Sequence, residues 1–157
     1  MPDLRGGQLT IDGATGPFDI VTDPWHPYEN ALTQLWFGND LEGEDTRVGG
    51  GDWVTNPKYW APTVVQIPMW FMGHIDRDGT PYESPMVGLE ANMTTWRTEI
   101  LDPTVIARSA TLTMPSGEER TNTISRLHLS GAGQRRPTGW PLTFEFRMTR
   151  PFAPEGS

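Results

Sequence analysis

The alternation of apolar and polar residues is clearest near the end of the chain. From Leu142 to Met148 every second residue is apolar, and the residues between them are polar or charged. This period of two is typical of a β-strand with one face in the core and one in water. Two more strands are predicted over Thr104–Met114 and Arg120–Leu129, joined by a tight turn at Pro115-Ser116-Gly117.

Strand patterns also occur in the first half of the chain. Gln8–Ile11 and Phe18–Val21 flank a turn-rich segment and predict an N-terminal hairpin. Thr63–Ile75 has the strongest strand pattern in the middle of the sequence, although Pro68 interrupts it. Because proline cannot donate a backbone hydrogen bond, we expect this strand to lie at a sheet edge, or to bend or bulge near Pro68.

One amphipathic helix is predicted between Met86 and Leu101. It begins at Ser84-Pro85, a capping serine followed by a proline in the first turn, and ends before Asp102-Pro103. Because no second helix is predicted, we expect this helix to cover a face or an edge of a sheet. Its apolar residues recur at steps of three and four and form one stripe, namely Met86, Leu89, Met93, Trp96 and Ile100.

The segment before the middle strand is harder to assign. Ala31–Phe37 fits either a strand or two helical turns, and both interpretations bury Leu35 and Trp36. From about 38 to 62 the sequence is rich in glycine and acidic residues, with Gly49-Gly50-Gly51 at its centre, and it predicts a long surface loop. Such loops are uncommon in compact domains, so we expect this one to be functional or ordered by a partner.

Together these elements predict a mainly β protein. A length of 157 residues suits a single domain, here 1–157. The 17 glycines and 15 prolines favour many short elements joined by tight turns. We therefore expect a two-sheet β-sandwich with one flanking α-helix.

Composition and charge narrow the possible partners. Cysteine is absent, which excludes disulfides and thiolate metal sites. The formal net charge of -8 argues against binding to a nucleic-acid backbone, which requires many Lys and Arg contacts. No apolar run approaches the roughly 20 residues that span a bilayer, and no secretion signal is visible. We expect a soluble protein without a membrane or a specific nucleic-acid partner.

The charge is unevenly distributed along the chain. Residues 1–57 contain ten acidic residues and two arginines, whereas residues 58–157 contain ten acidic and ten basic residues. One interpretation is that these are solvated faces that keep the protein soluble. The other is head-to-tail self-association, in which an acidic surface of one copy meets a basic surface of the next. Arg135 and Arg136, in the arginine-rich last third, are then candidate interface residues.

Patterns that would indicate an enzyme are absent from the sequence. The three histidines are far apart and show no metal-binding spacing, and no nucleophile elbow, P-loop or dinucleotide-binding fingerprint is present. Glu42, Glu44 and Asp45 lie close together but lack the alternating register of a calcium loop. We therefore expect no catalytic activity, no metal ion and no cofactor.

Seven tryptophans are a high count for this length. Trp36, Trp70, Trp96 and Trp140 each fall on an apolar period, which favours a place in the core. Trp53, Tyr59 and Trp60 instead cluster beside the acidic, glycine-rich segment. They fit either a sugar-stacking platform or the aromatic anchors of a protein interface.

Several short motifs spread through most of the chain support a family resemblance. They are Ala31-Leu32-Thr33-Gln34-Leu35-Trp36, Arg47-Val48-Gly49-Gly50, Ile75-Asp76-Arg77-Asp78-Gly79, Gly88-Leu89-Glu90-Ala91-Asn92 with Trp96-Arg97, Leu112-Thr113-Met114-Pro115-Ser116-Gly117 and Arg150-Pro151-Phe152. With these motifs the chain resembles the distal-tail family of minor tail proteins of long-tailed phages, particularly those infecting actinobacteria.

The resemblance implies both a fold and a role. The implied fold is that of tail tube and distal tail proteins, two packed β-sheets flanked by one helix. The implied role is a hexameric ring in the virion that joins the tail tube to the tail tip or baseplate, with further copies, the tube protein and tip proteins as partners. A tail tube subunit or a tail terminator is the alternative within this class. A carbohydrate-binding β-sandwich module is the alternative from another class.

Overall fold

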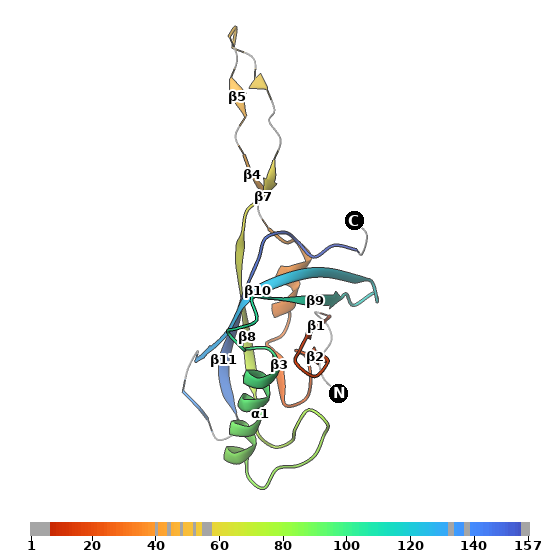
Figure 1. Ribbon diagram of the computed structural model, residues 1–157, viewed down its shortest axis with the longest axis vertical. Helices are drawn as coiled ribbons and strands as arrows, with labels where there is room; N and C mark the ends of the chain where they lie inside the picture. Colours follow the sequence, from red (N-terminus) through yellow and green to blue (C-terminus); the bar gives the residue numbers. More distant parts are fainter. Residues whose placement is uncertain are drawn as a thin grey trace.

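The computed structural model describes residues 7–39, 41–43, 45–47, 49–51, 53–54, 58–131, 134–136 and 139–154. Within them, one antiparallel sheet has the strand order β2-β1-β9-β10-β11-β8-β3. Figure 1 shows a two-stranded arm projecting from one end of the molecule and the helix α1 near the other end. The strands of the sheet are β1 (Gln8–Asp12), β2 (Pro17–Asp19), β3 (Trp25–Pro27), β8 (Thr63–Phe71), β9 (Ala107–Thr113), β10 (Glu119–Gly131) and β11 (Trp140–Met148).

The expected mainly β class and the expected helix are confirmed, but the two-sheet sandwich is not. The described residues form one curled seven-stranded sheet that surrounds its own core. The remaining strands form two separate two-stranded sheets in the arm. The N-terminal hairpin is present as β1 and β2, and β9 and β10 are joined by the turn that was predicted at Pro115. The helical interpretation of the segment 31–37 is correct, because η1 (Ala31–Trp36) is a 3-10 helix.

The position of Pro68 explains how proline fits into β8. β11 pairs with β8 along its whole length, whereas β3 pairs with β8 only at residues 69–71. Pro68 lies just where β3 ends, and its carbonyl accepts a hydrogen bond of 3.0 Å from Tyr28 N. The first part of β8 is therefore a sheet edge, as the missing backbone donor of Pro68 predicted.

The core is centred on the indole of Trp96, which α1 (Pro85–Glu99) inserts into the curl of the sheet. Trp96 is fully buried, and its ring centroid lies 5.4 Å from that of Phe18, 5.9 Å from Trp25, 5.0 Å from Phe71 and 5.1 Å from Phe144. Its indole N–H has no hydrogen-bond partner among the described residues. Trp96 therefore stabilises the fold through packing.

The two edges of the sheet meet beside Trp96. β2 and β3 stand at opposite ends of the strand order, yet the rings of Phe18 and Trp25 stack at 5.4 Å. Trp25 Nε1 also donates a 3.0 Å hydrogen bond to Asp19 O. These contacts bring the edges together, so the curl surrounds the core.

Direct backbone contact holds α1 against the end of β8. A Cβ added at Gly88 would overlap the carbonyl oxygen of Gly73. Nearby, the buried Asn92 donates 2.8 and 3.1 Å hydrogen bonds to Met72 O and Ile75 O. The Ser84 hydroxyl caps the helix by accepting from Val87 N at 3.3 Å, as the sequence predicted.

Some of the expected core residues are not in the core. Met86 belongs to the predicted helix stripe but is 54% exposed on the first turn of α1. Trp36, Trp70 and Trp140 are only partly buried. Trp25, which no periodic pattern singled out, is fully buried instead.

Replacing Trp96 by alanine is expected to lower the free energy of unfolding by about 3–5 kcal/mol, the usual cost of removing a large buried aromatic ring. Urea denaturation followed by fluorescence measures this difference. Ile106→Ala is the control, because Ile106 is 86% exposed and its loss should change little. Equal stability of Trp96→Ala and the unmodified protein would show that the core is not centred on this residue.

Candidate interaction surfaces

The arm stands where the sequence predicted a long surface loop around 38–62. β4 (Leu41–Glu42) pairs with β7 (Tyr59–Trp60), and β5 (Thr46–Arg47) pairs with β6 (Trp53–Val54), both antiparallel. Figure 1 shows β4 and β7 next to the body and β5 farther out. Strand-forming residues on both sides of a glycine turn explain the difference, because such a sequence favours a hairpin. Gly50 and Gly51 both adopt φ of 94° in that turn.

The arm exposes an apolar face near its base. Leu41 and Trp60 are cross-strand partners, so their side chains share one face of the ribbon, where they are 58% and 45% exposed. Glu42 and Tyr59 form the next pair, and Tyr59 is 61% exposed. Because successive residues of a strand point to opposite faces, Tyr59 and Trp60 cannot form one flat platform.

The base of the arm is fixed to the body by a buried amide. Asn39 is 5% exposed, and its Nδ2 donates to Ala61 O at 2.6 Å and to Met148 O at 3.2 Å. These bonds connect the start of the arm to the chain before β8 and to the end of β11. Farther out, Lys58 Nζ binds Gly43 O at 2.9 Å and Asp45 Oδ1 at 3.0 Å across the ribbon.

A groove of about 360 Å³ lies beside α1. Its apolar lining includes Met86, Met93 and Trp140, and its charged lining comprises Glu90, Arg97 and Arg135. All three charged residues are exposed. We call this site the α1 groove; it can accept an apolar side chain while two guanidinium groups contact acidic partners.

The structure separates the residues that the sequence marked as interface candidates. Tyr59 and Trp60 lie in the arm, as does the backbone of Trp53 in β6, whereas Arg135 lines the α1 groove. Arg136 is exposed, and its backbone pairs with that of Gly139. Figure 1 shows the arm and α1, whose groove Arg135 lines, toward opposite ends of the molecule. One copy therefore presents two separate surfaces.

Sequence reasoning missed two components of these surfaces. Leu41 gave no periodic signal, and its exposure follows from its pairing with Trp60 in the arm. Met86 was assigned to the core because it fits the helix stripe. Its place on the first turn, beside the capping Ser84, is the signal that could have indicated a surface position.

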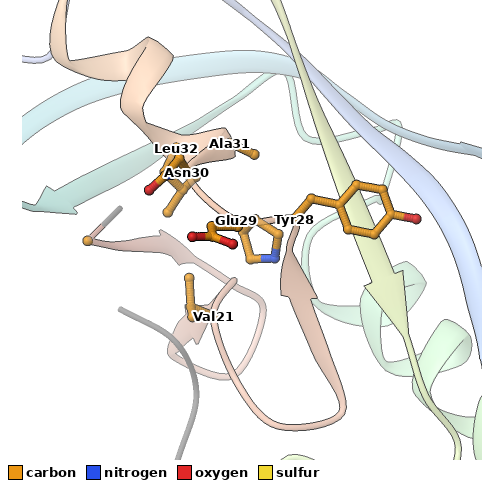
Figure 2. A pocket seen from close by; sticks show the side chains of 8 residues that line it. Val21, Tyr28, Glu29, Asn30, Ala31 and Leu32 are labelled. Carbon is orange, nitrogen blue, oxygen red and sulfur yellow. The ribbon is translucent and has the colours of Figure 1, made fainter. Parts of the chain in front are cut away.

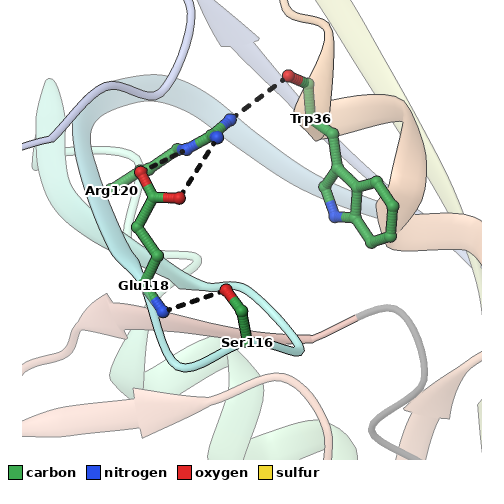
Figure 3. Close-up of polar contacts among 4 residues, drawn as sticks. All are labelled: Trp36, Ser116, Glu118 and Arg120. Carbon is green, nitrogen blue, oxygen red and sulfur yellow. Dashed lines mark hydrogen bonds and ion pairs between the residues drawn. The ribbon is translucent and has the colours of Figure 1, made fainter.

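Other arginines of the last two-thirds of the chain serve the fold. Arg120 forms two contacts of 3.3 and 3.4 Å with the Glu118 carboxylate and donates to Trp36 O at 3.4 Å, while Ser116 Oγ accepts from Glu118 N (Figure 3). Arg108 donates to Asp12 O at 2.9 Å. These contacts tie η1 and β1 to the β9–β10 hairpin. Only some of the arginine side chains in this part of the chain are therefore available to a partner.

A small pocket between Val21 and the segment 28–32 does not provide a ligand site. Figure 2 shows Glu29, Asn30 and Leu32 around this pocket. Its free volume is about 20 Å³, enough for roughly one water molecule.

The most buried carboxylate of the described chain connects the helix to the first hairpin. Glu99 is 4% exposed and accepts hydrogen bonds from Thr15 Oγ1 at 2.5 Å and Thr15 N at 3.3 Å, while Arg77 lies 3.6 Å away. Burial by itself raises the pKa of Glu99, but the Thr15 hydrogen bonds and the charges of Arg77 and Arg108 outweigh it and lower this pKa. Glu99 thus stabilises the folded state as a carboxylate.

No protein family, curated protein or solved structure matches this chain. Among the described residues, no group of three or more His, Cys, Asp or Glu side chains could hold a metal ion. In the same part of the chain, no helix is long and apolar enough to cross a membrane.

Replacing Asn39 by alanine is expected to lower the free energy of unfolding by about 1–3 kcal/mol, because the buried Met148 carbonyl and the partly buried Ala61 carbonyl lose their donor. Hydrogen exchange in the arm should also become faster. Gln34→Ala is the matched control, since Gln34 Nε2 also donates to two carbonyls but at an exposed site. Equal effects of the two substitutions, measured by urea denaturation, would contradict this role of Asn39.

Replacing Glu99 by glutamine is expected to reduce the acid sensitivity of the fold. A carboxylate with a lowered pKa contributes stability above the ordinary glutamate pKa of about 4.3, and this contribution is lost as the pH falls through the folded value. Glu99→Gln should therefore be less stable at neutral pH and lose less stability on acidification. Thermal unfolding at several pH values between neutral and acidic measures the stability at neutral pH and its loss on acidification. Glu90→Gln, on the exposed surface of the helix, is the matched charge control. Parallel curves for Glu99→Gln and the unmodified protein would refute the proposed contribution.

Proposed function

We propose that this protein is a structural subunit of a phage tail, which forms a ring in the virion between the tail tube and the tail tip or baseplate. The observation that carries this proposal is the projecting arm with its exposed Leu41 and Trp60. A two-stranded ribbon is marginally stable alone, and apolar groups exposed on it favour a protein partner. The motif resemblance to the distal-tail family supplies the position in the tail.

The separation of the two surfaces supports a ring. Because the arm and the α1 groove are different surfaces, contacts between them are heterologous, and heterologous contacts form either closed rings or open filaments. The resemblance favours a closed ring of six copies. In this role the partners are further copies, the tube protein and the tip proteins, and the protein needs no cofactor and no catalytic residue.

The tail-protein sandwich is part of this proposal. A mainly β body with one helix against its sheet supports it as far as the described strands extend. A tail tube subunit or tail terminator is the alternative within the class, since both share that fold. A carbohydrate-binding module is less well supported, because Tyr59 and Trp60 point to opposite faces of the arm.

Reversing two charges is expected to weaken assembly without unfolding the subunit. Arg135→Glu with Arg136→Glu changes two exposed positions, so the monomer should keep its stability. Sedimentation velocity should show smaller assemblies than for the unmodified protein. Salt above about 0.5 M should also weaken the exposed charged contacts, because it screens them strongly.

The control is Arg126→Glu with Arg150→Glu, which changes the net charge equally at two other exposed positions. This control should assemble as the unmodified protein does. If both double variants sedimented alike, a specific contribution of Arg135 and Arg136 to assembly would be wrong. Specific binding of sugars by a stable monomer would instead support the carbohydrate-binding alternative.

A further inference from the structure

The α1 groove has the properties of a receptor for an apolar, acidic segment. Met86 is 54% exposed at its edge, and Met93 and Trp140 are partly buried. Methionine side chains adapt their shape to an inserted group. Arg97 and Arg135 outnumber Glu90 among the charged lining residues, which gives the groove a net positive charge. A ligand that fits this groove combines apolar side chains with acidic ones.

The arm of this chain has the complementary properties. Its apolar face carries Leu41 and Trp60, and an indole supplies a large contact area. Residues 38–60 contain five acidic and two basic residues, a net charge of -3. Lys58 binds Asp45 within the arm, and this pair contributes no net charge. The arm thus combines an exposed apolar face with a sequence of net negative charge.

We infer that the α1 groove of one copy receives the arm of a neighbouring copy. The Leu41 and Trp60 face packs against Met86, Met93 and Trp140, and the net negative charge of residues 38–60 complements Arg97 and Arg135. This inference rests on the proposed function and adds to it which surface receives the arm. An arm cannot reach the groove of its own chain, because the two lie at opposite ends of the molecule (Figure 1).

A second groove of similar size serves as an internal comparison. It has about 440 Å³ and is lined by Val105, Ile106, Asp102, Arg126 and His128, among others. Ile106 is 86% exposed there. Its charged lining opposes Arg126 with Asp102, so it lacks the pair of arginines that distinguishes the α1 groove. A non-specific apolar contact would use both grooves alike.

Because the chain has no cysteine, single introduced thiols test this docking directly. Leu41→Cys marks the arm without removing Trp60, Met86→Cys marks the α1 groove, and Ile106→Cys marks the second groove. All three positions are more than half exposed, so the substitutions should leave the fold intact. Each groove variant is mixed with Leu41→Cys under mild oxidation, and the disulfide-linked heterodimer is quantified on non-reducing gels.

We expect the Leu41→Cys and Met86→Cys pair to form roughly tenfold or more heterodimer than the Leu41→Cys and Ile106→Cys pair, because docking raises the effective thiol concentration. Adding Arg97→Glu and Arg135→Glu to the Met86→Cys variant should remove this excess. Equal cross-linking of the two pairs would overturn the docking site.

Sedimentation of the same samples reports on the ring separately. Assemblies that form while the two pairs cross-link equally would leave the proposed function intact and refute only the receptor groove. Samples that stay monomeric and cross-link equally would contradict both.

Discussion

The packing of Trp96 against four aromatic rings is the interaction on which the rest of the structure depends. Phe18 and Trp25 come from the two edge strands of the sheet, so a single indole is in contact with both edges at once. No disulfide can replace this contact in a chain without cysteine. Within this curled sheet, the antiparallel strands β8 and β11 extend from the base of the arm toward the other end of the molecule, where α1 lies (Figure 1).

Much of the local structure could be predicted from the sequence. The alternation at 142–148 and the capping Ser84 identified β11 and α1, because both signals depend on neighbours close in sequence. The curl could not be predicted, since it depends on Phe18 meeting Trp25 across opposite sheet edges. The arm was taken for a loop because its strands are only two residues long and glycines separate them.

The candidate surfaces, too, could be predicted only in part from the sequence. Residue type was enough to mark Tyr59, Trp60 and Arg135, and all three are exposed. Residue type could not show that Leu41 lies opposite Trp60, or that Arg135 and Met86 line the same groove. These relations arise from pairing and packing between segments far apart in sequence. Their outcome is a subunit with unlike ends, and a subunit of that kind can form a ring.

Electron cryo-microscopy of virions carrying a tagged copy of this protein tests the central claim most directly. We expect one closed ring of identical copies at the junction of tail tube and tail tip, with each arm extending to the next copy. Tag density repeated along the whole tube, or no density in the virion, would contradict it.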